Sequence, residues 1–189
     1  MREPLIIKGG KNIDLRSKLL DEDIVLIDTD FNTDMASKII QQLLYLDTLG
    51  KKDPVQMYIN SPGGCVHSGL AIYDTVKNMK RDVATTAVGM AASMGAFMLT
   101  CAGKKGMRHV MPNAQVMFHE VSAGNSGRFS DMDVRHKHTK HLNNKLHLLI
   151  AEATGKKFDD VIKLFKEDQW MEGKEVVDFG AADKIVGEK

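Results

Sequence analysis

The sequence has few of the features that mark secreted and membrane proteins. Its 189 residues include only two cysteines, too few for a disulfide framework, so both thiols are expected to be reduced. No apolar run approaches the roughly 20 residues that span a bilayer. The first residues carry an acid and a proline and lack a long apolar stretch, which predicts no secretory signal. These absences favour a globular protein of the cytoplasm.

An excess of charge of either sign is also missing, because 26 Lys and Arg residues face 25 Asp and Glu residues. A nearly neutral chain gives no electrostatic reason to expect nucleic acid or an anionic membrane as a partner. No ligand-spaced cluster of Cys and His indicates a structural metal, and we expect no cofactor. The remaining composition, 43% hydrophobic and 27% charged, is typical of one globular domain over residues 1–189.

Strands and helices alternate along the sequence, which indicates the α/β fold class. The segment 121–127, rich in Gly, Ser and Asn, is by itself typical of a loop. Short apolar runs predict strands over 24–28, 55–60, 83–88, 115–118 and 184–186. Helical patterns predict helices between 32 and 50, just after Gly64, and over 130–153, 158–165 and 176–179.

Candidate catalytic residues follow the predicted strands, where α/β proteins bind ligands. Ser93 lies among small residues at the expected start of a helix, a position that resembles a nucleophile elbow without the G-x-S-x-G pattern. A serine needs a base, and His119 directly follows the strand 115–118. A third group must orient the imidazole, and the spacing does not choose among Asp168, Asp178 and Asp183.

These residues also have purely structural interpretations. Ser93 is also compatible with a packing or capping residue, and the Ser-Pro-Gly-Gly sequence of 61–64 is compatible with an ordinary turn. His119 is compatible with a hydrogen-bonded core histidine. Cys65 has no base beside it, so we expect a small buried residue. The long helix carries histidines that indicate a solvated face, with a metal-binding pair at 138 and 141 as the alternative: His136, His138, His141 and His147.

Three segments resemble the proteolytic subunit of Clp protease (the ClpP family) in their residues, their order and their spacing. They are Tyr-Ile-Asn-Ser-Pro-Gly-Gly at 58–64, Gly-Met-Ala-Ala-Ser-Met-Gly-Ala-Phe at 89–97, and Met-Phe-His at 117–119. The likeness extends over about residues 4–186. It implies a crotonase-like α/β head with a projecting handle, about residues 120–154, formed by a strand over 121–127 and the long helix. The resemblance thus replaces the loop expected at 121–127 with a strand.

The same resemblance implies a serine endopeptidase and assigns roles to matching positions. Ser93 matches the nucleophile, His119 the general base, and Asp168, in the frame Lys-Glu-Asp-Gln-Trp, the third triad member. Backbone N–H groups of Gly64 and Met94 would form the oxyanion hole. Val66 and Met94 match pocket positions that favour small to medium apolar side chains. The full set of expected substrate-binding residues is Gly63, Val66, Val121, Ser122 and Ala123.

The resemblance also implies partners and one departure beside the active site. It predicts a homo-oligomer of stacked heptameric rings that receives protein or peptide substrates from an ATP-dependent (AAA+) unfoldase. Gln56, Asn78 and His109 stand where the family's docking pockets usually have aromatic residues, which predicts weaker docking of a conventional unfoldase. Glu120 stands where the family usually has glutamine, and a carboxylate there can raise the imidazole pKa or steer substrate choice.

Three other functions remain open at this point. One is a non-catalytic or specialised ring subunit, and another is a phage-type protease of the same family that works without an unfoldase. The third is a crotonase-type acyl-CoA enzyme, because that superfamily also builds oxyanion holes from glycine turns. The presence of Ser93, His119 and Asp168 favours a protease over the first and third of these.

Overall fold

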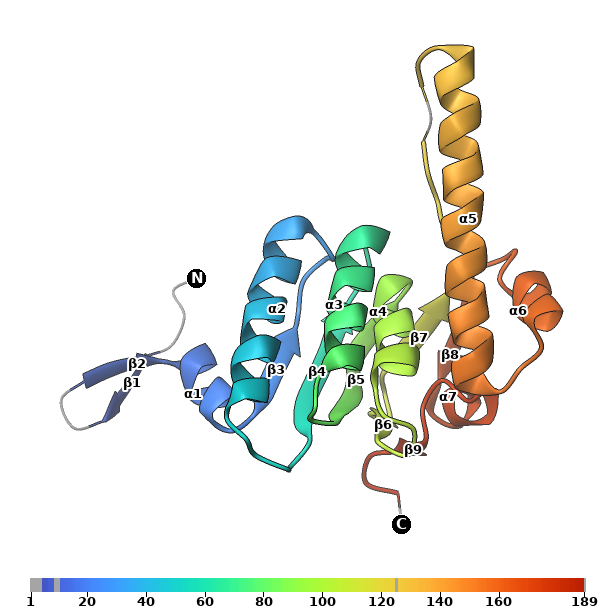
Figure 1. Ribbon diagram of the computed structural model, residues 1–189. Helices are drawn as coiled ribbons and strands as arrows, with labels where there is room; N and C mark the ends of the chain where they lie inside the picture. Colours follow the sequence, from blue (N-terminus) through green and yellow to red (C-terminus); the bar gives the residue numbers. More distant parts are fainter. Residues whose placement is uncertain (1–4, 9–10, 125, 189) are drawn as a thin grey trace.

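The structure is a computed structural model that describes residues 5–8, 11–124 and 126–188 (Figure 1). The chain begins with an antiparallel hairpin, β1 (Leu5–Lys8) and β2 (Lys11–Asp14), which projects from the rest of the molecule. The short helix α1 (Leu15–Asp21) follows, and its first turn is capped by Asp14, whose carboxylate accepts a hydrogen bond of 2.8 Å from the Ser17 N–H.

A seven-stranded sheet forms the centre of the described chain. Five strands run parallel in spatial order: β3 (Ile24–Ile27), β4 (Val55–Ser61), β5 (Val83–Ala92), β6 (Arg108–Val110) and β9 (Lys184–Ile185). The ten-residue β5 is long enough to pair with β6 along its first half and with β7 (Gln115–Phe118) at its end. β8 (Gln169–Glu172) then adds antiparallel to β7. This branching places the ends of β5 and β7 side by side.

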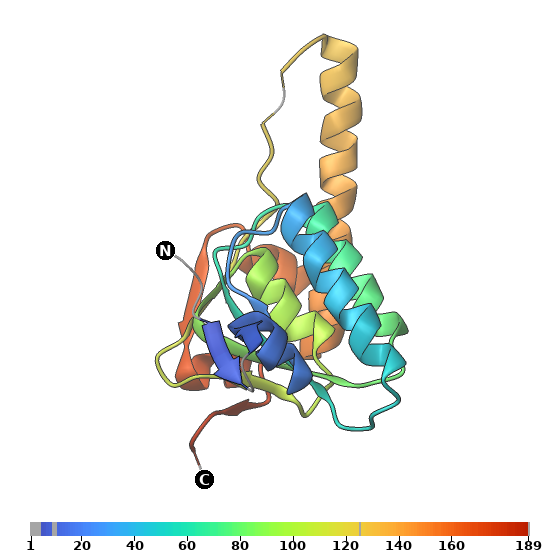
Figure 2. The same ribbon diagram turned by 90° about the vertical axis from the view of Figure 1, so that its left-hand side faces the viewer.

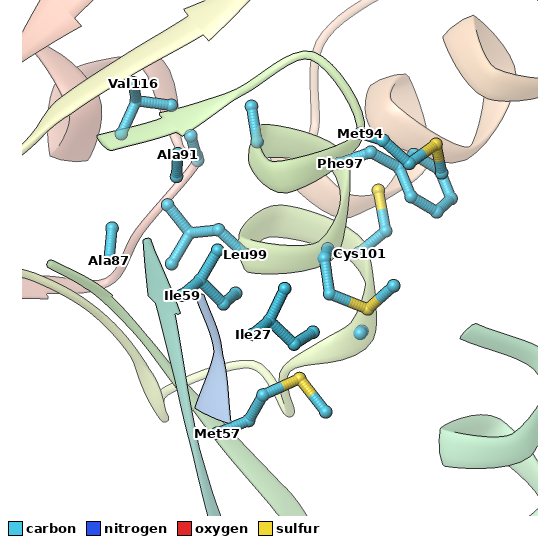
Figure 3. Close-up of a cluster of buried hydrophobic side chains, with 14 of the residues drawn as sticks. Ile27, Met57, Ile59, Ala87, Ala91, Met94, Phe97, Leu99, Cys101 and Val116 are labelled. Carbon is cyan, nitrogen blue, oxygen red and sulfur yellow. The ribbon is translucent and has the colours of Figure 1, made fainter. Parts of the chain in front are cut away.

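Helices cover one face of the sheet and bury the main core. They are α2 (Thr33–Thr48), α3 (Val66–Asn78) and α4 (Met94–Phe97), which continues as the π-helical turn η1 (Met98–Ala102) (Figures 1 and 2). Alternate residues of β4 are buried, as expected for a strand with one face on the core. Figure 3 shows Ile59 of this strand beside Leu99 from the segment after Ser93, and Met57 and Phe97 belong to the same buried cluster.

A long helix, α5 (Phe129–Thr154), projects beyond the head (Figure 1). Its buried residues all lie in the last third of the helix, where it contacts the head; Phe129 at its outer end is 84% exposed and Val134 65% exposed. α6 (Phe158–Leu164) and α7 (Gly173–Phe179) complete the fold. Within the described residues, the structure has no helix with the length and apolar character to cross a membrane.

Two expectations are corrected here. The strand expected over 121–127 is not formed at the described residues of that segment, because none of the strands that the structure describes pairs with them. The segment runs along α5 instead (Figures 1 and 2), so the loop interpretation holds for the isolated chain. Cys65 is exposed rather than buried, because it is the N-cap residue of α3 in the turn that follows β4, although both cysteines are free as expected.

Candidate active site

Ser93 and His119 are brought together by two neighbouring parallel strands. Ser93 follows the last residue of β5, and His119 follows the last residue of β7. Ala92 and Met117 are register partners, and the Ser93 N–H donates a 2.7 Å hydrogen bond to the Met117 carbonyl. Parallel strands end at the same edge of a sheet, so both side chains reach one pocket, which they line together.

The backbone of Ser93 adopts a conformation that only glycine accepts easily, with φ +52° and ψ −114°. Two hydrogen bonds hold it there, since its N–H binds Met117 and its carbonyl accepts the N–H of Phe97 at 3.0 Å. A side chain at such a position costs about 1–3 kcal/mol and persists where the surroundings enforce it. The tight turn between strand and helix is the geometry of a nucleophile elbow.

Asp168 is the only one of the three candidate carboxylates placed beside His119. β8 is antiparallel to β7 with Phe118 opposite Gln169, so the flanking residues His119 and Asp168 meet, with Nδ1 and Oδ1 4.0 Å apart. Asp178 lies exposed on α7. Asp183 is occupied elsewhere by an ion pair of 2.6 Å with Arg108.

The glycine turn after β4 packs directly against the Ser93 turn. Gly63 and Gly64 have φ values of +98° and +141°, and a Cβ on Gly63 would lie only 2.7 Å from the Ser93 Cβ and 2.9 Å from the Met94 nitrogen. Met94 is the first residue of α4, where backbone N–H groups have no partner within the helix. Gly64 and Met94 both line the pocket of Ser93, as an oxyanion hole requires.

The pocket is a cavity of about 60 Å³ between the sheet edge and α5. Three expected substrate-binding residues line it, namely Val66, Val121 and Ser122. Gly63 lies behind the Ser93 turn, and Ala123 is exposed farther along the same segment. The other lining residues come from β7, the segment after it, α4 and α5: Phe97, Phe118, Glu120, Asn143, Leu146, His147 and Ile150.

Comparison with known proteins identifies the family. The family model for Clp protease matches residues 7–189, nearly the whole chain. The chain belongs to the Clp protease family. A relative, ATP-dependent Clp protease proteolytic subunit 1 of Salinibacter ruber (strain DSM 13855 / M31), is 36% identical over 181 residues, which cover 96% of this chain and 77% of the relative.

Membership of the Clp protease family confirms the expected fold class and makes the chain a homologue of Clp proteolytic subunits. Proteins of this family are serine peptidases, form oligomeric rings and work with Clp ATPases. The match favours proteolysis over the acyl-CoA chemistry that the crotonase superfamily left open.

Asn143 on α5 is a contact of the Clp protease pocket that the sequence did not reveal. Its Oδ1 accepts a hydrogen bond of 2.9 Å from the N–H of Val121 and so fastens the segment after His119 to α5. Asn143, Leu146, His147 and Ile150 recur at the i, i+3, i+4, i+7 spacing of one helix face. That spacing was the available signal.

Removing this contact is expected to affect substrate binding more than chemistry. Asn143→Ala should raise KM for a peptide several-fold with a smaller change in kcat, because the segment after His119, where substrate-binding residues are expected, loses its anchor; it should also cost about 1 kcal/mol of stability. Steady-state kinetics and urea denaturation measure the two effects. Asn144→Ala is the matched control, since Asn144 is exposed and has no side-chain hydrogen bond within the described residues. Equal KM values for the two variants would contradict the role of Asn143.

His147 is buried, with 2% of its surface exposed, and the interpretation of a solvated face is wrong for this residue. It lies on the apolar face of α5 that contacts the head, whereas His136, His138 and His141 are exposed as expected. Burial lowers the pKa of His147 below its ordinary value of 6.5, and the charge of Glu120 opposes this shift only in part. No group of three or more metal-ligating side chains occurs in the part of the chain that the structure describes.

The lowered pKa of His147 predicts a loss of stability in acid. The pKa of this imidazole is lower in the folded protein than its ordinary value of 6.5 in the unfolded chain, so the unfolded chain binds more protons as the pH falls below 6.5 and acidification favours unfolding. Each unit of difference in pKa contributes about 1.4 kcal/mol. Urea denaturation at pH 7.5 and 5.5 should show a smaller pH dependence for His147→Leu than for the wild type. Burial also lowers the pKa of His109, but this residue contributes the same pH dependence to the wild type and to His147→Leu. His141→Leu, an exposed site on the same helix, should keep the wild-type dependence; an unchanged dependence in His147→Leu would contradict the prediction.

Proposed function

We propose that this protein is a serine endopeptidase in which Ser93, His119 and Asp168 form the catalytic triad. The observation that supports it is the β5–β7–β8 pairing, which delivers these three side chains to one edge of the sheet. Ser93 Oγ attacks the peptide carbonyl, and His119 takes its proton and then passes it to the leaving amine. Asp168 faces Nδ1 of His119, orients the ring and stabilises its cation, which leaves Nε2 for Ser93.

In the isolated chain, the 4.0 Å between His119 Nδ1 and Asp168 Oδ1 exceeds a hydrogen bond. The Asp168 side chain is 62% exposed, so it has freedom to move. Catalytic contacts often tighten only in the substrate complex. We therefore assign the closing of this contact to the binding of substrate or of a neighbouring subunit.

Backbone groups around Ser93 complete the proposed mechanism. The N–H groups of Gly64 and Met94 stabilise the oxyanion of the tetrahedral intermediate, where a single donor typically contributes about 3–4 kcal/mol. The described residues of the segment 121–127 form no strand within the chain, which leaves their backbone available to an extended peptide. Gly63, Val66, Val121, Ser122 and Ala123 are the proposed substrate-binding residues.

We also propose that the subunits assemble into stacked heptameric rings in the cytoplasm. The exposed Phe129 and Val134 on the projecting part of α5 are apolar surface suited to a second copy of the chain. The two free cysteines fit a reducing compartment. An ATP-dependent unfoldase would supply substrates but dock weakly, since Gln56, Asn78 and His109 are polar where the family usually presents aromatic residues.

Hydrolysis of a short fluorogenic peptide, without ATP or any partner, tests the proposed function. Short peptides need no unfolding, so the assay separates the chemistry from unfoldase docking. We expect steady hydrolysis of the peptide, and we expect a serine-reactive organophosphonate to abolish it. No hydrolysis by assembled protein, or hydrolysis insensitive to the reagent, would contradict a serine peptidase.

A further inference from the structure

His147 is a buried polar side chain without a partner in the wall of the active-site pocket. Neither Nδ1 nor Nε2 has a hydrogen-bond partner among the described residues, and both nitrogens are shielded from solvent. Burying an unpaired polar group is costly, and native proteins pair nearly all such groups. A ring held in this state in the lining that it shares with Ser93 and His119 is therefore placed to bind something that enters the pocket.

Packing fixes the position of the His147 ring. It is carried by the part of α5 that is buried against the head, between Leu146 and Ile150. The ring of Phe165 packs against it with centroids 5.6 Å apart and planes at 69°. Leu146, His147 and Ile150 all line the pocket, so a ligand can approach the imidazole from the pocket. Because the nitrogens are closed to solvent, a ligand reaches them when the pocket widens.

The charge around His147 limits what that ligand can be. Burial keeps the pKa of the imidazole low, so near neutral pH the ring offers one N–H donor and one nitrogen acceptor. Glu120 lines the same pocket and its charge acts on His147, which disfavours an acidic ligand. A cationic side chain brings donors only and leaves the imidazole N–H unpaired. A carboxamide brings both a donor and an acceptor and satisfies both nitrogens.

We propose that His147 is a specificity-determining residue that selects Gln or Asn as the residue on the N-terminal side of the cleaved bond. The inference rests on the proposed serine peptidase function and deepens it. Val66 and Met94 supply the apolar walls from which a preference for small to medium apolar side chains was expected. His147 adds a desolvated polar contact, and such contacts discriminate strongly against ligands that cannot pair with them.

Peptides that differ only at this residue, with Gln, Leu or Glu, test the proposal. The wild type should cleave the Gln peptide with the highest kcat/KM. His147→Leu should lower the ratio of kcat/KM for Gln over Leu by about 10- to 100-fold. His147→Asn keeps a donor and an acceptor and should retain the preference for Gln. A wild type that cleaves the Leu peptide faster than the Gln peptide would overturn the proposal. A ratio of kcat/KM for Gln over Leu that His147→Leu leaves unchanged would also overturn it, as would an equal loss of activity on all peptides in both His147→Leu and His147→Asn.

Binding measurements separate this inference from the proposed function. In the Ser93→Ala background, fluorescence anisotropy of the same peptides should show tighter binding of Gln than of Leu, and His147→Leu should abolish the difference. Cleavage that persists in Ser93→Ala would refute the proposed function alone. Equal binding of the two peptides by Ser93→Ala, whether or not the wild type cleaves them, would refute the role of His147.

Discussion

Replacing Ser93 with alanine is expected to lower kcat/KM for a short peptide by about 10³- to 10⁶-fold. The variant loses the only atom proposed to attack the carbonyl, while the pocket and the glycine turn remain to bind substrate. Alanine fits the strained backbone at this position no worse than serine, since both carry a Cβ. The loss should therefore fall on kcat, with the KM and the unfolding midpoint close to those of the wild type.

Ser37→Ala is the matched control for this experiment. Ser37 is an exposed serine on α2, outside the lining of the pocket, and its hydroxyl accepts one hydrogen bond from Gln41. This variant should keep wild-type kinetics. Activity of Ser93→Ala within a few-fold of that control would remove Ser93 from the mechanism.

Asp183→Ala is expected to have the largest effect on stability, a loss of about 3–5 kcal/mol in the free energy of unfolding. Asp183 forms an ion pair with Arg108, whose side chain is 4% exposed. Its carboxylate also accepts hydrogen bonds from the backbone N–H groups of Gly106 and Arg108. Burial disfavours the Asp183 carboxylate, but the Arg108 hydrogen bonds outweigh it and hold its pKa below the ordinary value. Without Asp183, a buried guanidinium loses its counter-charge.

The stability change can be measured by urea denaturation with the fluorescence of Trp170, the single tryptophan. Asp178→Ala removes an exposed carboxylate from α7 and should shift stability by less than about 0.5 kcal/mol. Both variants must be compared at one protomer concentration, because assembly raises apparent stability. A loss below about 1 kcal/mol for Asp183→Ala would show that the pair contributes little more than a surface ion pair.

The longer elements of the fold were predictable because their apolar patterns are strong. The strand expected over 55–60 and found over 55–61, and the long helix, expected over 130–153 and found over 129–154, follow directly from those patterns. The strands β6 and β8 were missed, since Arg-His-Val and Gln-Trp-Met-Glu are short and at least half of their residues are polar. Such strands form through their neighbours in the sheet, and a local pattern does not report those neighbours.

Some residues of the candidate site were predictable from the sequence pattern alone, and others were not. Ser93 and His119 followed from strand ends, because parallel strands end at a common edge. Asp168 could be chosen over Asp178 and Asp183 only through the family resemblance, since its place depends on the pairing of β7 with β8. His147 was misjudged because the four histidines of the long helix were assigned together to a solvated face, although the i, i+4 spacing of His147 from Asn143 places it on the buried face.

Covalent labelling by a fluorophosphonate, mapped by mass spectrometry, tests most directly whether Ser93 is an activated nucleophile. We expect the label on the peptide that contains Ser93, and we expect His119→Ala to slow labelling by orders of magnitude, since the serine then lacks its base. Labelling of another residue, or equal rates in the wild type and His119→Ala, would contradict it.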